Sequence, residues 1–419
     1  MAIKSLGVSN FKGISDATSF DIKPLTIFIG PNSSGKSSCI HALASLAQTI
    51  KLGDTSRALT LDDEFAQVHL GRYIEIVHSK SYTDIIEIGL NLGPTNLQSK
   101  IGERVHQVAG DITATYYFKS TKRTQEVYVH LATLAIGDRE IKFSLDSKNG
   151  TYKAQDSSSN QTYLATNTGN FFFELTWDAG VIDEDWVFST TIIRTIQKQL
   201  SQELRKTSYL GPFRQSPLRR YPYRGSTPVE VGAQGEAAVS LLANEFMQSK
   251  KRSHTKQISD WLKDLGLARA VKVARVGSSD LFDVSIEMTD QVSLPIADLG
   301  YGLSQILPVL VQCSFAQEGS TLLFEQPELH LHEGAARKLA KIFADVISIK
   351  KVHIVAETHS RDLFFGIINE VREEKIDHND VITYDVIREG GCSTYTPIKI
   401  IKDEGHFEVS HRWGRELEQ

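Results

Sequence analysis

Apolar positions along the chain follow two different spacings, and these predict where strands and helices lie. Residues 24–30, PLTIFIG, form a short apolar run that predicts a buried strand, and the apolar spacing of residues 36–50 predicts a helix directly after it. From about residue 72 to residue 177, apolar and polar residues alternate in segments bounded by Gly, Asn and Ser, which indicates an antiparallel β-rich region. Within it, the polar stretch 155–170 predicts a surface loop.

Helical spacing returns in the second half of the chain, from about residue 192. It is clearest in residues 193–206, 235–248 and 257–268. Two apolar runs, 321–326 and 350–358, then flank a helical stretch, which is a strand–helix–strand unit and implies a parallel sheet. The chain contains no heptad repeat, which excludes long coiled-coil arms.

These patterns predict an α/β fold made of four stretches. Residues 1–75 and 293–419 are expected to form the two parts of one core. Residues 76–190 are expected to form an antiparallel β-rich insert, and residues 191–292 a helical lobe.

Composition narrows the class of protein. The 419 residues carry a formal net charge of -5, which argues against a generally basic nucleic-acid coat, and the run at 250–252 is best explained as a solvated helix end. Three widely spaced cysteines indicate neither a disulfide framework nor a zinc site. The N-terminus lacks the apolar core of a secretion signal, and no run approaches the ~18 apolar residues of a membrane span. We therefore expect a cytoplasmic protein without membrane contact.

Residues 30–38, GPNSSGKSS, match the phosphate-binding pattern G-x-x-x-x-G-K-[ST]. A predicted buried strand precedes the pattern and a predicted helix follows it, so loop amides and a helix N-terminus would point at one phosphate. Lys36 would reach the β- and γ-phosphates, and Ser37 would offer a hydroxyl to Mg²⁺. The alternative is a tight turn with a surface lysine. The residues expected to contact the nucleotide are Gly30, Pro31, Asn32, Ser33, Ser34, Gly35, Lys36, Ser37 and Ser38.

Three downstream segments suit the same chemistry. Glu325 ends an apolar strand, where its carboxylate would hold the metal, and His359 follows the next strand, where it would contact the γ-phosphate or the attacking water. Residues 298–310 place glycines and Ser304 before an apolar helix, which offers amides and a hydroxyl to an anion. Each segment alone also fits a structural role: an exposed acid, a structural histidine and a helix cap.

In this order the motifs resemble the ATP-binding-cassette class. The resemblance implies an ABC-type P-loop NTPase head that binds ATP and Mg²⁺ and forms a homodimer or higher oligomer. In that class the signature loop, here Gly302, Ser304 and Gln305, meets the γ-phosphate held by the other protomer. Gln67 stands where the class places a glutamine that senses the metal, although a surface polar residue is an equal alternative. The implied metal contacts are Ser37, Glu325 and Gln67.

More narrowly, the chain is similar to cassette-type AAA ATPases related to the OLD-nuclease ATPase domain and to RecF and SMC heads. The similarity rests on NFKGI, IFIGPNSSGKSS, YLGPFRQSP, VGAQGEAAVSLL, DLGYGLSQILPVL, EQPELHLH and ETHS. Members include ATPase subunits of antiphage systems such as Septu and PARIS, which work with a separately encoded nuclease. The nucleases of the OLD class add a TOPRIM domain with an Asp-x-Asp pair, and the residues after His359 lack that pair.

Gln326 departs from the cassette pattern, which has a glutamate there as the general base. An amide cannot accept a proton at neutral pH, so hydrolysis is expected to be slow. Pro327 predicts an extended Gln326, which would place Glu328 on the same side as a substitute base, reached through a relayed water. The catalytic set is therefore Glu325, Gln326, Glu328 and His359.

Two other clusters have weaker signals. Arg214, Arg219, Arg220 and Arg224 alternate with tyrosines, which suits phosphates or stacked bases, but pairing with acids at a protomer interface is favoured slightly. His330 and His332 lack a third metal ligand and are interpreted as part of a loop at the dimer interface.

The motifs together predict an ATPase that dimerises on ATP and regulates a partner effector, a nuclease in antiphage defence. The alternative is a DNA-repair or DNA-clamping ATPase of the RecF or SMC type, for which DNA contact is required. A nucleotide-binding scaffold without turnover is a third interpretation.

Overall fold

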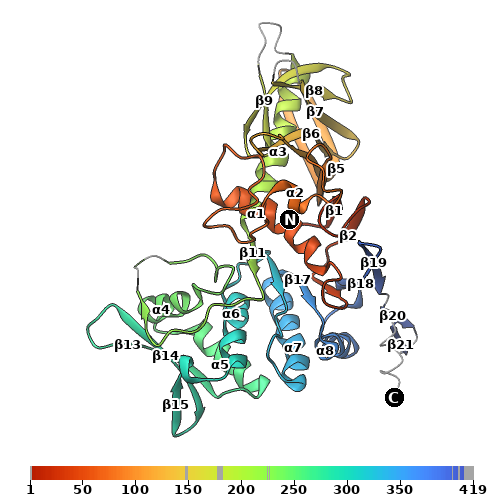
Figure 1. Cartoon of the computed structure of the whole chain (residues 1–419). Helices are drawn as coiled ribbons and strands as arrows, with labels where there is room; N and C mark the ends of the chain where they lie inside the picture. The colour runs from red at the N-terminus through yellow and green to blue at the C-terminus, as the bar shows by residue number, and fades with distance from the viewer. Residues whose placement is uncertain are drawn as a thin grey trace. The chain divides into compact units, whose positions relative to one another are not determined.

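The structure is a computed structural model that describes residues 2–146, 150–176, 183–223, 225, 227–398, 400–403 and 406–409. Figure 1 traces the course of the chain, which divides into two compact units. The first contains residues 1–22, 33–207 and 387–394, and the second contains residues 23–32, 208–386 and 395–419. Both units are discontinuous, so each combines segments from several of the four stretches defined above.

The first unit is built on a nine-stranded antiparallel sheet with the order β10-β9-β8-β7-β6-β5-β4-β1-β2. These strands are β1 (Ser5–Ser9), β2 (Thr18–Asp21), β4 (Ile86–Ile101), β5 (Arg104–Ser120), β6 (Val127–Ile136), β7 (Arg139–Asp146), β8 (Thr151–Asp156), β9 (Thr162–Gly169) and β10 (Phe172–Leu175). Its helices are α1 (Lys36–Leu52), α2 (Tyr73–Ile76) and α3 (Glu184–Arg205). The large antiparallel sheet confirms the β-rich character that the alternating residues predicted.

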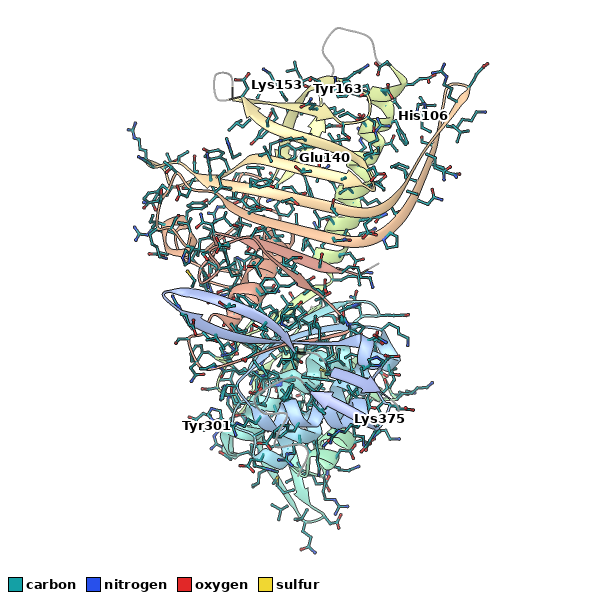
Figure 2. All side chains as sticks on the ribbon, turned by 90° about the vertical axis from the view of Figure 1, so that its right-hand side faces the viewer. His106, Glu140, Lys153, Tyr163, Tyr301 and Lys375 are labelled. Atoms are coloured by element: carbon teal, nitrogen blue, oxygen red, sulfur yellow. The ribbon has the colours of Figure 1, made fainter. Side chains whose placement is uncertain are left out.

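Helix α3 packs against this sheet, as Figure 2 shows. Its buried residues include Phe188, Ile192 and Ile196, spaced by four positions so that they lie on one face. Beyond the end of β6, the β4–β5 hairpin continues as a two-stranded ribbon. The ring of His106 on this ribbon lies 5.1 Å from that of Phe188 (Figure 2).

The surface loop predicted at residues 155–170 is wrong for most of its length. Strand β9 occupies Thr162–Gly169 and pairs with both β8 and β10. Its side chains are mostly exposed, with Ala165 buried, so the hydrophobic signal of a strand is weak there. Pairing on both sides, rather than apolar burial, fixes β9 in place.

The second unit is built on a six-stranded sheet with the order β11-β16-β17-β3-β18-β19. The strands are β3 (Leu25–Ile29), β11 (Thr207–Leu210), β16 (Thr321–Glu325), β17 (His353–Thr358), β18 (Val381–Glu389) and β19 (Cys392–Ile398). Strands β16, β17, β3 and β18 are parallel, which confirms the predicted parallel sheet. Helices α6 (Tyr301–Phe315), α7 (Glu333–Lys350) and α8 (Arg361–Arg372) accompany it. The ring of Phe324 on β16 stacks on that of Phe343 on α7, which joins the sheet to its helices.

The predicted helical lobe contains more than helices. It holds α4 (Ala238–Gln248) and α5 (Ser253–Leu265), but also β12 (Tyr221–Pro222), β13 (Ala270–Arg275), β14 (Leu281–Thr289) and β15 (Val292–Pro295). The alternation in β14, where Phe282, Val284 and Ile286 are buried, is a period-2 signal that the helical prediction overlooked.

The remaining short elements are the 3₁₀ turns η1 (Ile296–Asp298) and η2 (His378–Asp380) and the hairpin of β20 (Ile400–Asp403) and β21 (His406–Val409). None of the helices in the described part of the chain is both long and apolar enough to cross a bilayer.

Candidate functional site

The phosphate-binding loop joins β3 to α1 through backbone conformations that few residues adopt. All five residues of β3 are buried, and the chain then turns at Gly30 with φ 155°, Ser33 with φ 63° and Gly35 with φ 102°. Gly35 caps α1 without a side-chain hydrogen bond, and the Ser38 amide in the first turn donates to the Gly35 carbonyl at 3.0 Å. Lys36 begins α1 and is only 4% exposed. A glycine-rich turn before an uncapped helix is the geometry that cradles phosphate.

Contacts within the first unit hold this loop. The Ser393 hydroxyl donates to the Ser34 carbonyl at 2.7 Å, and Arg388 Nη1 donates to the Ser33 carbonyl at 3.4 Å. The Ser34 hydroxyl is buried and has no hydrogen-bond partner among the described residues. An unpartnered buried hydroxyl is costly unless a ligand satisfies it. The loop residues therefore fit a phosphate group.

The parallel register brings the functional strand ends to one edge of the sheet. Glu325, the last residue of β16, pairs with Glu357 on β17, and Glu357 pairs with Phe28 on β3. Thr358 pairs with Ile29, so Gly30 and His359 follow neighbouring strands at the same edge. Ligands of open parallel sheets bind at such carboxyl ends.

Glu325 is buried and its carboxylate is held by a tyrosine that the sequence did not single out. The Tyr209 hydroxyl donates to Glu325 Oε1 at 2.7 Å. Burial and the neighbouring carboxylate raise the pKa of Tyr209 well above its ordinary value, so the group remains a phenol and a donor. The sequence signal that could have identified Tyr209 is its place in the motif YLGPFRQSP.

The predicted extended conformation of Gln326 is wrong. Gln326 has φ 47°, its amide donates to the Glu357 carbonyl at 3.0 Å, and its carbonyl accepts from Leu329 at 3.1 Å. These hydrogen bonds turn the chain directly after β16 and override the preference that Pro327 imposes. The argument that an extended segment puts Gln326 and Glu328 on the same side therefore does not apply.

Glu328 lies in the turn that follows Gln326, and it has one oxygen bound and one open. Its Oε1 accepts from the Thr358 hydroxyl at 2.5 Å, whereas buried Oε2 has no hydrogen-bond partner among the described residues. Burial raises the pKa of Glu328, opposed by the Thr358 hydrogen bond and by the charges of His359 and Arg214. An ionisable, desolvated carboxylate with an open oxygen is equipped to accept a proton.

The turn after β17 carries His359, which is exposed. Thr358 is buried, and its hydroxyl oxygen also accepts from the Ser360 amide at 2.9 Å, on the far side of His359. Thr358 thus links the Glu328 carboxylate to the backbone around His359. In the sequence, Thr358 is marked only by its place in ETHS.

The predicted signature residues lie at the start of α6, and two of them are covered. Ser304 is 5% exposed and its hydroxyl donates to the Tyr301 carbonyl at 3.0 Å, while Gln305 is 6% exposed. Gly300 caps the helix without a side-chain hydrogen bond, and Tyr301, labelled in Figure 2, is 69% exposed. A Cβ on Gly302 would lie 2.9 Å from the His330 carbonyl oxygen. The accessible part of this segment is its open helix N-terminus.

Gln67 follows a segment that is anchored to α1. Gln48 of α1 donates from Nε2 to the carbonyls of Thr60 and Val68, and its Oε1 accepts from the Val68 amide. The side chain of Gln67 itself is half-buried. Its metal-sensing role stays a prediction.

The arginine cluster pairs within the chain. Arg219 donates two hydrogen bonds to Asp298, at 3.0 and 2.5 Å, and Arg220 lies 3.9 Å from Asp283. Arg214 is buried against the turn after β16, and Arg224 lies outside the described residues. These intrachain partners leave less of the cluster for an interface than the sequence suggested.

The two histidines have separate surroundings. His332 caps α7 by accepting from the Ala335 amide, and His330 lies beside the Tyr301 ring. In the part of the chain that the structure describes, no group of three or more His, Cys, Asp and Glu residues could hold a metal.

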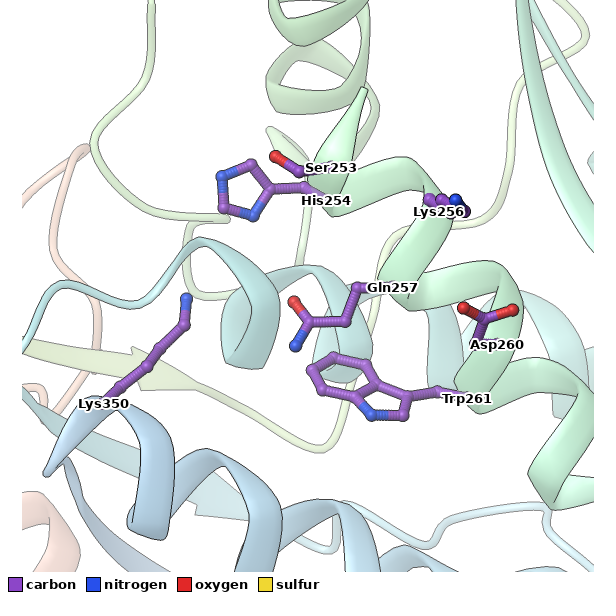
Figure 3. A pocket seen from close by; sticks show the side chains of 7 residues that line it. All are labelled: Ser253, His254, Lys256, Gln257, Asp260, Trp261 and Lys350. Carbon is purple, nitrogen blue, oxygen red and sulfur yellow. The ribbon is translucent and has the colours of Figure 1, made fainter. Parts of the chain in front are cut away.

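A separate hollow of about 440 Å³ lies at the start of α5 (Figure 3). It is lined by Ser253, His254, Lys256, Gln257, Asp260, Trp261 and Lys350. His254 Nδ1 lies 3.0 Å from the Ser314 hydroxyl, which donates to Gln257 Oε1 at 2.8 Å. None of the lining residues belongs to the motifs above.

Comparisons with known proteins place the chain in a family. A comparison with curated proteins gives no match. Solved structures that match include an SMC head domain from Thermotoga maritima, with 12% identity over 96% of this chain and 100% of that chain and a TM-score of 0.42. An SMC head bound to the C-terminal winged-helix domain of ScpA has 12% identity, 95% and 98% coverage and a TM-score of 0.48. Residues 1–364 match the AAA ATPase domain family, and because this match spans most of the chain, the protein belongs to that family.

Proposed function

We propose that this AAA-family protein binds ATP with Mg²⁺, hydrolyses it slowly, dimerises around it and thereby regulates a partner effector. The observation that carries the proposal is the shared sheet edge. There, the phosphate loop after β3, the Glu325 turn after β16 and the His359 turn after β17 follow neighbouring parallel strands.

The proposed roles follow from the side chains of the matched motifs. Lys36 neutralises charge on the β- and γ-phosphates, and the amides at the start of α1 bind phosphate oxygens. The Ser37 hydroxyl and the Glu325 carboxylate are the groups that would hold Mg²⁺, with Gln67 as an additional contact. The bound ion would supply positive charge against the phosphate oxygens.

Slow hydrolysis follows from the residue after the acid. Gln326 cannot take a proton, and loss of a general base typically costs ~10²- to 10⁴-fold, which would bring a ~10 s⁻¹ reaction to ~0.1–0.001 s⁻¹. Glu328, with its open oxygen, is the residue that we propose accepts the proton from water. His359 lies in the turn after β17, where the Ser360 amide donates to the Thr358 hydroxyl, and it would donate to the γ-phosphate or orient that water.

The proposed dimer uses the start of α6. Its amides lack a side-chain cap, and an uncapped helix N-terminus attracts the negative charge of a phosphate. We propose that this end closes on the γ-phosphate bound by a second copy. Because Ser304 and Gln305 are buried, the contact is assigned to the backbone of residues 300–302.

The effector is proposed from the motifs that resemble the ATPases of antiphage systems. In that resemblance the ATPase chain carries no nuclease acids of its own, and ATP-dependent dimerisation regulates a separately encoded nuclease. This part is tested with the product of the neighbouring open reading frame. If that product is a nuclease and co-purifies with the ATPase, the result supports the proposal.

The ATPase proposal is tested by phosphate release from purified protein. We expect slow, Mg²⁺-dependent release that is lost in Lys36→Ala, because the variant lacks the only side chain of the loop that neutralises the phosphates. Equal release from the wild type and Lys36→Ala would contradict the proposal. Binding of a fluorescent ATP analogue, measured in parallel, separates loss of binding from loss of turnover.

A further inference from the structure

The loop after β11 reaches the turn that carries the catalytic acid. Besides the Tyr209 hydrogen bond to the Glu325 side chain, Arg214 Nη2 donates to the Glu325 carbonyl at 3.2 Å and to the Gln326 carbonyl at 3.0 Å. One short segment thus contacts the carboxylate and two successive backbone carbonyls of the same turn. All four residues belong to the second unit.

The turn requires such support because its backbone is unusual. Gln326 has φ 47°, a left-handed conformation that costs a non-glycine residue about 1–2 kcal/mol. Residues held in this region persist where surrounding contacts fix them. The Gln326 carbonyl accepts from both Leu329 and Arg214, so removal of Arg214 loosens the conformation at the position from which Glu328 is aimed.

Arg214 is buried although only one of its three guanidinium nitrogens, Nη2, makes hydrogen bonds to the described residues. It is 7% exposed, and its Nε and Nη1 have no hydrogen-bond partner among the described residues. Burial lowers the pKa of Arg214 to about 10, which leaves it protonated at neutral pH, and Glu328 is the acid whose charge favours that state most. Burying a cation lowers the stability of a protein unless nearby acids compensate for the lost hydration. The position of Arg214 beside Glu325 and Glu328 therefore indicates a role in this site.

Tyr209 lies in β11 and Arg214 in the loop after it, and this loop is itself anchored. The amides of Gly211 and Gln215 donate to the carbonyls of Ala233 and Gln234, each at 2.8 Å. Gly235 then lies close to α6, since a Cβ there would be 2.6 Å from Cβ of Pro308. Tyr209 therefore projects from a strand paired to β16, and Arg214 projects from an anchored loop.

We propose that Tyr209 and Arg214 are positioning residues of the hydrolysis site. Tyr209 fixes the orientation of the Glu325 carboxylate, which would hold Mg²⁺, and Arg214 holds the left-handed turn that carries Glu328. The inference rests on the proposed ATPase function and deepens it. It also gives the motif YLGPFRQSP a role, since this motif supplies both side chains.

Tyr209→Phe tests the first half, because it removes only the hydroxyl. We expect the Mg²⁺ concentration for half-maximal hydrolysis to rise by about 10- to 100-fold, as is usual when a hydrogen-bond partner of a metal ligand is lost. Thermal unfolding without nucleotide should change little. Tyr221→Phe is the matched control: its hydroxyl accepts from the Leu218 amide, away from the turn, and its Mg²⁺ requirement should equal that of the wild type.

Arg214→Lys tests the second half, because it keeps a cation but loses the planar guanidinium. We expect turnover at saturating Mg²⁺ to fall by about 10-fold or more while ATP binding is retained, with Arg220→Ala as an unaffected control arginine. If Arg214→Lys fails to fold, Arg214→Gln, whose neutral amide can still donate to a carbonyl, replaces it, and unchanged turnover in that variant would overturn the role of Arg214.

The results that would overturn this inference differ from the results that would overturn the proposed function. If the wild type hydrolyses ATP and Tyr209→Phe has the same Mg²⁺ requirement, the positioning role is overturned and the ATPase remains. If the wild type releases no more phosphate than Lys36→Ala, the ATPase proposal itself fails. The inference is then decided by Mg²⁺-dependent binding of a fluorescent ATP analogue, where an unchanged Mg²⁺ requirement in Tyr209→Phe overturns it.

Discussion

Gln326 stands where the cassette class has its general base, and Glu328 is the base that we propose; the environments of these two side chains differ. Gln326 is half-buried and occupies the strained position of the turn, whereas Glu328 is buried with one open oxygen. We predict that Glu328→Gln lowers the single-turnover rate by ~10²- to 10⁴-fold, because it removes the base but keeps a side chain of similar size. Gln326→Glu should raise the rate, since it places a carboxylate directly after Glu325.

Rapid-quench measurement of bound ATP and ADP checks both variants, with ATP binding as the control for each. An unchanged rate in Gln326→Glu together with loss of turnover in Glu328→Gln would show that Glu328 is the base and that Gln326 does not cause slow hydrolysis. Unchanged turnover in Glu328→Gln would remove Glu328 from the mechanism.

The hydrogen bond from Thr358 affects the pKa of Glu328, and its effect can be measured in the pH dependence of hydrolysis. Its hydrogen bond to Glu328 favours the ionised carboxylate and opposes the rise in pKa that burial causes. Because proton transfer needs ionised Glu328, hydrolysis declines as the pH falls through this pKa. In Thr358→Val the opposing hydrogen bond is lost, so the pKa of Glu328 rises and the acidic limb of the pH–rate profile moves to higher pH.

The comparison is made by single-turnover hydrolysis across a pH series. Thr383→Val is a matched control, since Thr383 is also buried in the same sheet but lies on β18. A Thr358→Val profile with an unshifted acidic limb would contradict the assignment.

At this scale the sequence predicted the residue types but not their geometry. Glu325 and His359 were chosen from their places at strand ends, which the parallel register brings to one edge, whereas Glu328 was chosen from an extended conformation of Gln326 that the structure does not have. The turn at Gln326 could not be predicted, because it depends on hydrogen bonds to Glu357 and Arg214, which are distant in the sequence.

Among the elements, sequence prediction succeeded where burial is strong. The fully buried β3 and β16 stand out as apolar runs, whereas β9 is mostly exposed and was predicted as a loop. Strands β13 to β15 were included in a helical lobe because the helices on both sides dominated the pattern. Exposed strands are defined by their pairing partners, and local hydrophobicity does not encode those partners.

The packing of α7 against α8 depends on a glycine. A Cβ on Gly366 of α8 would lie 2.3 Å from the Arg337 carbonyl oxygen and 3.0 Å from Cβ of Ala340. Helix propensity alone predicts that Gly366→Ala stabilises the protein by about 1 kcal/mol, whereas forced overpacking typically costs about 1–3 kcal/mol. Since the nearest atom belongs to the backbone, we predict net destabilisation, measured as a lower free energy of unfolding in urea.

Gly334→Ala in α7 is the matched control for that experiment. Its Cβ would meet only the His332 ring, at 3.4 Å, which is ordinary contact. We expect Gly334→Ala to be neutral or slightly stabilising. A more stable Gly366→Ala protein would mean that α7 and α8 do not approach as closely as described.

For the whole molecule, the central prediction is an ATP-dependent dimer that needs the exposed end of α6. A charge at Tyr301 tests it without disturbing the core, because this side chain is 69% exposed at the first position of the helix. Tyr301→Glu favours the helix itself, since acids near a helix N-terminus stabilise it by about 0.3–1 kcal/mol. The same carboxylate would repel the γ-phosphate of the other protomer. We therefore predict that Tyr301→Glu binds ATP normally but remains monomeric.

The measurement is light scattering of Glu328→Gln protein with ATP and Mg²⁺, in which slow turnover preserves the bound nucleotide. This protein should be dimeric, and adding Tyr301→Glu should make it monomeric while fluorescent ATP still binds, whereas Lys36→Ala should lose both. Tyr301→Phe is the control that keeps the ring and adds no charge. A dimer that survives Tyr301→Glu would show that α6 does not meet the nucleotide of a second copy. Salt-sensitive DNA binding that strengthens with ATP would instead favour the DNA-clamping alternative, because phosphate contacts release counterions.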